Sequence, residues 1–195
     1  MKHLAKTSIV LAVAAAFMVT DATAQVRGVF GVGLSVPVGD FADETGGAAE
    51  AGGATALAGI EWLPQGKSFG LRVDGAYNRF CTSACDEATS DRDIRYRFLN
   101  ATLNGLMEFP LGAEGNLRPY MLAGVGLYNY RLEGDDVTAG ADDSQSDFGV
   151  NGGLGLTYAM GRVGVFAEGR FHNVFATGSD LQFIPMMVGA RINLQ

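Results

Sequence analysis

The sequence is poor in the residue types that build most catalytic and metal sites. It has two cysteines and two histidines in 195 residues, and His172 is the only histidine after residue 24. A structural zinc site normally takes four cysteine or histidine ligands, so Cys81 and Cys85 alone do not predict a metal site. In an exported protein, two cysteines four residues apart predict a short local disulfide instead.

Nucleic-acid and nucleotide partners are disfavoured by two further deficits. Lys and Arg total 14 against 21 Asp and Glu, and the formal net charge is −7, whereas nucleic-acid-binding proteins present a basic face. The glycine pairs at Gly31, Gly124 and Gly153 lack the third glycine of a phosphate-binding fingerprint, and no helix is expected after them. No nucleic acid and no cofactor are therefore predicted.

Long apolar runs are missing beyond the N-terminus. Lys2 and Lys6 precede an apolar run over residues 8–19, and Ala22-Thr23-Ala24 follows it, which is the pattern of a cleavable signal peptide. The run is too short for the ~20 residues of a spanning helix. We predict a signal peptide at 1–24 and one mature domain at 25–195, which can cross a membrane only as a closed barrel of strands.

Alternating apolar and polar residues recur in eight segments, and turn residues separate them. The 28 glycines alternate with apolar residues, which indicates strands that bend or pack closely. The segments are 26–38, 54–63, 69–80, 94–109, 120–130, 148–160, 163–175 and 181–194. The fold class predicted is all-β, an eight-stranded antiparallel up-and-down transmembrane β-barrel.

Two of these segments are ambiguous. In 94–109, Ile94, Tyr96 and Phe98 fall on the opposite parity from the apolar residues that follow, and a bulge near Phe98 and Leu99 would reconcile the two halves. In 120–130 both faces are largely apolar, so the direction of its side chains stays open.

The connections between segments favour a membrane barrel. Long connections at 39–53, 81–93 and 132–147 alternate with short ones at 64–68 and 161–162, as in outer-membrane barrels with short periplasmic turns and long outer loops. A soluble lipocalin-like barrel or β-sandwich would also alternate, but with its apolar face inward. The direction of the apolar face therefore decides between the two.

Charged residues share the parity that faces inward in a membrane barrel. An eight-stranded barrel is narrow enough to be filled by side chains, and enclosed charges must pair. We predict a structural network that plugs the interior, and a gated ion path is the alternative. The predicted lumen network consists of Arg27, Glu61, Arg72, Asp74, Glu108, Arg131, Glu168, Arg170 and Arg191.

Aromatic residues fall near the ends of the segments, where girdles flank the apolar band of a transmembrane barrel. The residues 120–130 and 148–158 each cover ten steps, which rise about 25 Å at a tilt near 40°. The predicted girdles contain Trp62, Phe69, Tyr77, Tyr120, Tyr128, Tyr130, Phe148 and Tyr158.

Several motifs resemble a known family. They are Phe30-Gly31-Val32-Gly33-Leu34-Ser35-Val36-Pro37 with Gly39-Asp40-Phe41, then Arg118-Pro119-Tyr120-Met121-Leu122-Ala123-Gly124-Val125-Gly126, Phe166-Ala167-Glu168-Gly169-Arg170-Phe171 and Ile184-Pro185-Met186-Met187-Val188-Gly189. Over nearly all of 25–195 the chain resembles the small outer-membrane β-barrels that include outer-membrane protein A transmembrane domains and opacity-type, porin-like proteins. The resemblance implies the outer membrane of a Gram-negative bacterium, contact with outer-membrane lipids, and barrel-assembly machinery as a partner during biogenesis.

The activity that we predict is structural or surface-interacting, and not enzymatic. The alternatives are a narrow pore for ions or small solutes and an outer-membrane lipid-modifying enzyme, in which His172 would act with Ser179 as a nearby hydroxyl. The outer connections are rich in carboxylates, among them Asp86, Asp142 and Asp143, and could hold divalent cations weakly.

Overall fold

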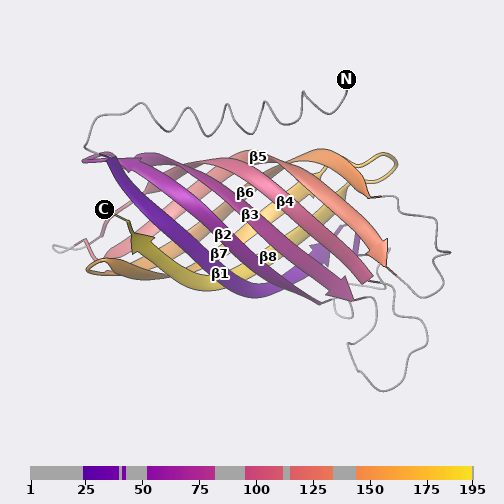
Figure 1. Cartoon of the computed structure of the whole chain (residues 1–195), viewed down its shortest axis with the longest axis horizontal. Helices are drawn as coiled ribbons and strands as arrows, with labels where there is room; N and C mark the ends of the chain where they lie inside the picture. The colour runs from indigo at the N-terminus through magenta and orange to yellow at the C-terminus, as the bar shows by residue number, and fades with distance from the viewer. Residues whose placement is uncertain are drawn as a thin grey trace, which may run out of the picture.

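The strands close into a single barrel (Figure 1). The computed structural model describes residues 24–39, 41–42, 52–81, 95–111, 115–133 and 144–194. The strands are β1 (Ala24–Val38), β2 (Gly53–Pro64), β3 (Phe69–Cys81), β4 (Arg95–Glu108), β5 (Leu117–Glu133), β6 (Gln145–Met160), β7 (Val163–Val174) and β8 (Leu181–Asn193). No helix within these ranges is long and apolar enough to span a bilayer.

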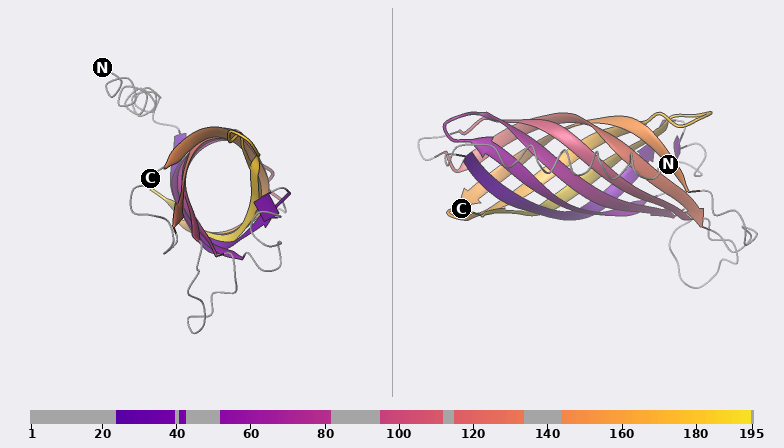
Figure 2. Two further views of the ribbon diagram at one scale, coloured as in Figure 1. Left: turned by 90° about the vertical axis from the view of Figure 1, so that its right-hand side faces the viewer. Right: turned by 45° about the horizontal axis from the view of Figure 1, so that its top comes forward.

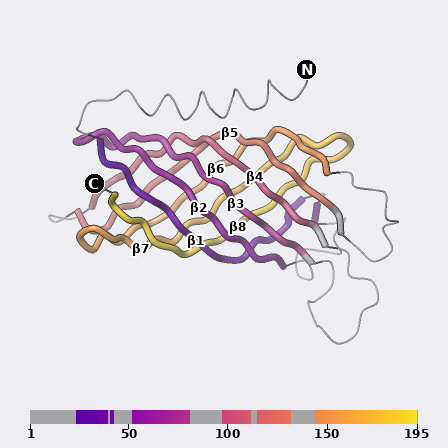
Figure 3. Tube along the Cα trace, viewed as in Figure 1, coloured from indigo at the N-terminus to yellow at the C-terminus, as the bar shows by residue number. Residues whose placement is uncertain are grey.

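Each strand pairs antiparallel with its neighbours in the chain, and β1 pairs with β8 to close the ring. The end-on view in Figure 2 shows the closed ring, and the trace in Figure 3 follows the tilted strands around it. The predicted eight-stranded antiparallel barrel is confirmed. Closure leaves no strand edge exposed, as a backbone in lipid requires.

The apolar face of the barrel points outward. On β1, Phe30, Val32 and Leu34 are 54%, 62% and 66% exposed, while Arg27 and Ser35 on the other parity are 3% and 0% exposed. The same alternation runs along β7, where Val165 and Phe171 are exposed and Glu168 and Arg170 are buried. This arrangement is the reverse of a soluble barrel, so the lipocalin-like alternative is wrong.

The two ends of the barrel differ in their connections. The start of β1 and the end of β8 lie at one end, shown at the left of Figure 1, together with the short turns at 65–68 and 161–162. The segments 39–52, 82–94 and 134–144 connect strands at the other end. Since bacterial barrels have short periplasmic turns, the end with the termini is the periplasmic end and the other is the outer end.

The predicted bulge in the fourth strand is wrong. β4 pairs without interruption with β3 over residues 95–107 and with β5 over residues 95–108. Phe98 is 0% exposed because its side chain points into the lumen. Its parity is that of the buried Asn100 and Thr102, so the strand needs no extra residue to explain it.

Candidate functional site in the barrel lumen

The middle and the periplasmic half of the lumen hold four arginines and four carboxylates. All eight side chains are at most 4% exposed and belong to salt bridges. We call this set the charged layer, and it consists of Arg27, Arg72, Arg170, Arg191, Glu61, Asp74, Glu108 and Glu168. Its formal charges cancel, which is what a water-poor interior requires of ionised groups.

Two salt bridges cross the full width of the barrel. Strands β3 and β7 are four positions apart in a ring of eight, so they face each other across the lumen. Arg72 Nη1 on β3 donates to Glu168 Oε2 on β7 at 2.7 Å. In the opposite direction, Arg170 Nη2 on β7 donates to Asp74 Oδ2 on β3 at 2.9 Å. These reciprocal bonds tie the two walls together and occupy the centre of the lumen.

A second set of bridges lies nearer the periplasmic end. Glu108 of β4 accepts from Arg27 of β1 at 2.6 Å and from Arg191 of β8 at 3.0 Å. Glu61 of β2 lies 3.0 Å from both of these arginines. Since β4 and β8 also face each other, four strands are joined here across the barrel.

Neutral donors complete the charged layer. Tyr120 donates its hydroxyl to Glu168 at 2.7 Å, and Thr102 donates to Asp74 at 2.7 Å. The Tyr120 ring has space only because residue 155, directly opposite it on β6, is a glycine: a Cβ there would collide with the ring. The guanidinium of Arg191 lies 4.0 Å from the centre of the same ring, a cation–π contact.

The outer half of the lumen is closed by apolar packing instead. We call this cluster the aromatic cap, and it consists of Phe41, Phe80, Phe98, Tyr128, Val174, Leu181 and Phe183. Rings meet edge to face at 5.5 Å for Phe41 and Phe80 and at 5.6 Å for Phe80 and Phe98. Phe41 follows β1 in the chain and is fully buried, so a residue outside the strands enters the mouth of the barrel.

His172 lies at the boundary between the two layers. Its Nδ1 is 2.8 Å from the Tyr128 hydroxyl, and its ring stacks on Phe183 with centres 4.8 Å apart and an interplanar angle of 3°. Only 3% of the residue is exposed. His172 is therefore enclosed in the lumen, away from the lipid-facing surface.

Four of the predicted site residues lie elsewhere than expected, all on β5. Tyr120 and Tyr128 are 2% and 0% exposed and point into the lumen, so their place in the girdles was predicted wrongly. Arg131 has the opposite parity from that predicted. Its side chain is exposed on the outer surface and does not belong to the charged layer. The two tyrosines fit in the lumen because Gly149 and Gly155 of β6 leave room for their rings. Arg131 points outward because alternation along β5 places its odd-numbered residues on the outer face.

Tyr130 is the fourth of these residues, because it shares the inward parity of Tyr128, is half-buried and packs against the aromatic cap, with its hydroxyl bonded to Gln145 and Asp147. Its place in the girdles was also predicted wrongly. The other predicted girdle residues lie on the outer surface. Trp62 is partly exposed on the outward parity of β2. Phe69, Tyr77, Phe148 and Tyr158 are 39–53% exposed on the outer surface.

The sequence reading missed the aromatic cap as a unit. The signal was present, because Phe80, Phe98 and Phe183 share the parity of the charged residues on their own strands. It could not be recognised without knowing that one end of the lumen is apolar. Phe41, which lies outside any alternating segment, gives no such signal.

Some predictions fall outside the described residues. They are the disulfide between Cys81 and Cys85, cation binding by most of the acidic outer connections, and the signal peptide up to residue 23. Within the described ranges, no group of three or more histidine, cysteine or carboxylate side chains could hold a metal ion.

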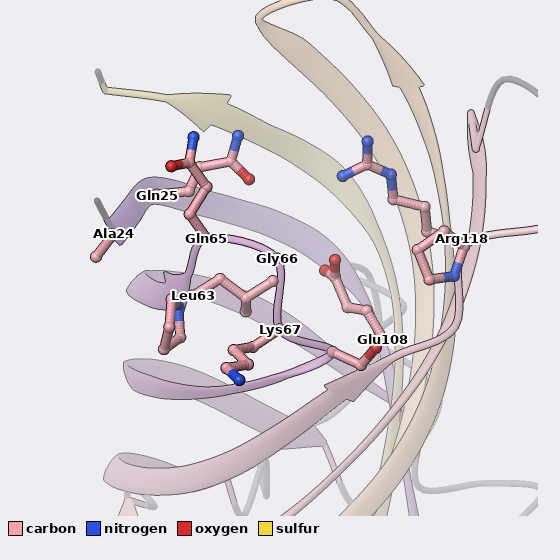
Figure 4. A pocket seen from close by; sticks show the side chains of 11 residues that line it. Ala24, Gln25, Leu63, Gln65, Gly66, Lys67, Glu108 and Arg118 are labelled. Carbon is pink, nitrogen blue, oxygen red and sulfur yellow. The ribbon is translucent and has the colours of Figure 1, made fainter.

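A cavity of about 410 Å³ opens at the periplasmic end (Figure 4). Lys67 and Arg118 lie at its sides, and Glu108 of the charged layer extends into it. Glu108 is only 2% exposed and is held by Arg27 and Arg191. The cavity is thus a shallow mouth that ends at the charged layer.

An apolar outer wall around a polar interior defines a transmembrane β-barrel. Residues 9–192 match the family model described as the outer membrane protein beta-barrel domain. The chain belongs to this family, and it lies in the outer membrane of a Gram-negative bacterium, in contact with its lipids.

Solved structures of low sequence identity resemble the fold. Neisserial surface protein A is 15% identical, with 89% of this chain and 98% of that one covered and a TM-score of 0.60. Ail, the attachment invasion locus protein of Yersinia pestis, is 14% identical, with 87% and 97% covered and a TM-score of 0.48. The outer membrane enzyme PagL is 14% identical, with 88% and 99% covered and a TM-score of 0.47. Comparison with curated proteins gave no match.

Proposed function

We propose that this protein is a closed outer-membrane barrel, neither a pore nor an enzyme, that acts through its outer surface. The observation that carries the proposal is the pair of seals in the lumen. The charged layer joins opposite walls by salt bridges, and the aromatic cap fills the outer mouth above it.

An ion path would have to break both seals. Removing one partner of a buried ion pair costs about 3–5 kcal/mol, and the arginines here are shared between carboxylates, so several bonds would open together. The aromatic cap adds an apolar layer, in which the Tyr128 hydroxyl is the one polar group among the side chains of its seven members. A permanently closed barrel fits this arrangement better than a gated one.

An enzymatic role in lipid modification is less well supported. A lipid substrate approaches from the outer wall or the rim, whereas His172 is enclosed between Tyr128 and Phe183. Its Nδ1 already has a partner in the Tyr128 hydroxyl, and no nucleophile motif accompanies it in the sequence.

The surface role rests on the outer connections. Three of them, at 39–52, 82–94 and 134–144, are longer than the periplasmic connections and rich in Asp and Glu. Similar barrels include proteins named for surface or attachment roles, and the likeness of the present chain to Neisserial surface protein A concerns the fold. Weak divalent-cation binding by these carboxylates, and insertion by barrel-assembly machinery, belong to the same proposal.

Conductance in planar bilayers tests the closed lumen. The wild-type protein should give no steady channels. A variant that loses one ring of the cap (Phe98→Ala) or one cross-barrel bridge (Arg170→Ala with Asp74→Ala) should stay closed, because the rest of both seals remains. The variant that combines all three changes weakens both seals and should open more often than either of the other two. Steady wild-type channels that disappear when Glu168 or Arg170 is changed would overturn the proposal.

Two further measurements complete the test. Gel mobility with and without boiling shows that each variant is a folded barrel before it enters the bilayer. Mass spectrometry of lipid A from cells with and without the protein should show no difference. A change in lipid A that is lost on His172→Ala would establish the enzymatic alternative.

A further inference from the structure

Three arginines form a row across the outward face of neighbouring strands. Arg79 of β3 is directly opposite Arg97 of β4, and Arg97 is directly opposite Arg131 of β5. All three side chains are exposed. We call this set the arginine row.

The arginine row lies just beyond the outer edge of the apolar belt. Two residues before it on β3 is Tyr77, which is paired with Leu99 of β4, and these are 39% and 61% exposed. One step of two residues along a tilted strand rises about 5 Å. The guanidinium groups therefore lie at the level of the membrane where lipid headgroups replace acyl chains.

Like charges directly opposite each other on adjacent strands destabilise a sheet. In such pairs the Cβ atoms are only about 4.5–5.5 Å apart. The arrangement becomes favourable when an anion lies against it, because each guanidinium can donate two parallel N–H bonds to a phosphate. Arg97 and Arg131 also interact within the chain, but five N–H donors per guanidinium allow a ligand in addition.

The distribution of the other basic residues sets this surface apart. Four arginines are consumed in the lumen, and Lys67, Arg118 and Arg162 lie at the periplasmic end. Every remaining Lys or Arg after residue 24 falls between positions 79 and 131 of the sequence. The arginines of the outer end are thus restricted to β3, β4, β5 and the connection at 82–94, and that connection carries four carboxylates beside its one arginine.

We propose that the arginine row binds the phosphates of lipid A, the phosphorylated glycolipid of the outer leaflet. The guanidinium groups hold the phosphates, and the exposed apolar side chains directly beneath them contact the acyl chains. These side chains include Leu99 and Leu103 of β4 and Val125 and Leu127 of β5, which are 41–63% exposed. Charge and apolar surface are therefore stacked in the order in which a phosphorylated glycolipid presents them.

Titration of the folded full-length protein in detergent with fluorescent lipid A tests this proposal. The variant Arg79→Gln with Arg97→Gln and Arg131→Gln should bind lipid A at least about tenfold more weakly, which corresponds to about 1.4 kcal/mol. The matched control is Lys67→Gln with Arg118→Gln and Arg162→Gln, which makes the same charge change at the periplasmic end. It should bind within about twofold of the wild type, because only general charge attraction is reduced.

Two further lipids identify the ligand group. Lipid A without its phosphates should bind the wild type and the arginine-row variant alike. Phosphatidylglycerol should bind weakly to both. An equal loss of phosphatidylglycerol binding would show a general anion surface and overturn the assignment to lipid A.

The affinities of the arginine-row variant and of the control variant for lipid A can also overturn the proposal. Unchanged lipid A affinity in the arginine-row variant, or an equal loss in the control, overturns the proposal. Gel mobility before boiling verifies folding of each variant. If the triple variant does not fold, the single variant Arg97→Gln takes its place: a loss of about threefold or more supports the proposal, and wild-type affinity overturns it.

Discussion

The two layers of the lumen are closed by different interactions. The charged layer depends on bonds between particular atoms, such as Arg72 Nη1 and Glu168 Oε2, that cross from one wall to the other. The aromatic cap depends on the packing of rings around Phe98, which contacts Phe41, Phe80, Tyr130 and Phe183. The first is directional and fails when one partner is lost, whereas the second can partly collapse into a gap.

The charged layer and the aromatic cap also differ in the role that each has in the barrel: the first holds the strands of the wall together, and the second closes the outer mouth. Charged residues come from six of the eight strands, so their bonds fix the distance between strands that do not touch. The cap includes Phe41 from outside the strands, and it closes the lumen without crossing it by polar bonds. Stability should therefore depend more on the charged layer, and access from outside more on the cap.

The largest effect is expected from Glu168→Gln. Glu168 accepts bonds from Arg72, Arg170 and Tyr120, so the change leaves two buried arginines with one carboxylate fewer. We expect a loss of about 3–5 kcal/mol in the free energy of unfolding, measured by urea titration in lipid vesicles. Asp147→Asn at the outer rim, which removes a half-buried acid, should cost less than about 1 kcal/mol. Equal losses would show that the bonds of the charged layer stabilise the barrel no more than a bond at the rim.

Truncation of the cap at Phe98→Ala should cost somewhat less. The expected loss is about 3 kcal/mol, the lower end for a buried phenylalanine, because the cavity lies near the outer mouth and neighbouring rings can shift. The control is Leu99→Ala, the next residue on β4, which faces lipid and is 61% exposed. Lipid chains can close around the shortened side chain, so its loss should be smaller in the same urea titration.

A smaller effect is expected at the glycine that accommodates Tyr120. Gly155→Ala would force the Tyr120 ring away from Glu168 and cost about 1–3 kcal/mol. Gly152→Ala on the same strand is the control, because the nearest atom to its added Cβ is 3.8 Å away. For both variants we measure the temperature at which heating before the gel changes the mobility from that of the folded barrel to that of the unfolded chain. A matching shift for the two variants would show that Tyr120 does not need this space.

The smallest effect tests the boundary between the layers. Tyr128→Phe removes the hydroxyl bonded to His172 Nδ1 and should cost about 1 kcal/mol, since a buried nitrogen loses its partner. Tyr130→Phe is the control, because its hydroxyl bonds lie at the rim, where water replaces them. If Tyr130→Phe proved the more costly, His172 would not depend on Tyr128.

Much of the barrel could be predicted from the sequence because alternation has a period of two. Eight charged residues mark the inward parity on six of the strands, and the outward apolar residues follow from it. The sequence also gave enough information to place the chain in its family, and the family match confirms that prediction. These features depend on local pattern alone.

The errors arose where both faces are apolar. On β5, Tyr120, Leu122 and Tyr128 face the lumen while Met121, Val125 and Leu127 face lipid, so polarity does not distinguish the sides. The direction is decided by neighbours on other strands, namely Glu168 for Tyr120 and His172 for Tyr128. Phe98 was misread for the same reason, since its partners Phe41 and Phe183 are distant in the sequence.

The closure between β1 and β8 has a consequence for biogenesis. Seven of the eight strand pairings join neighbours in the chain and can form as hairpins while the polypeptide is still being delivered. The eighth joins residues 27–38 to residues 182–193, nearly the whole length of the domain apart. Until the last strand arrives, the first strand keeps a free edge, and the long-range pairing that completes the cylinder is the slow step expected from its sequence separation.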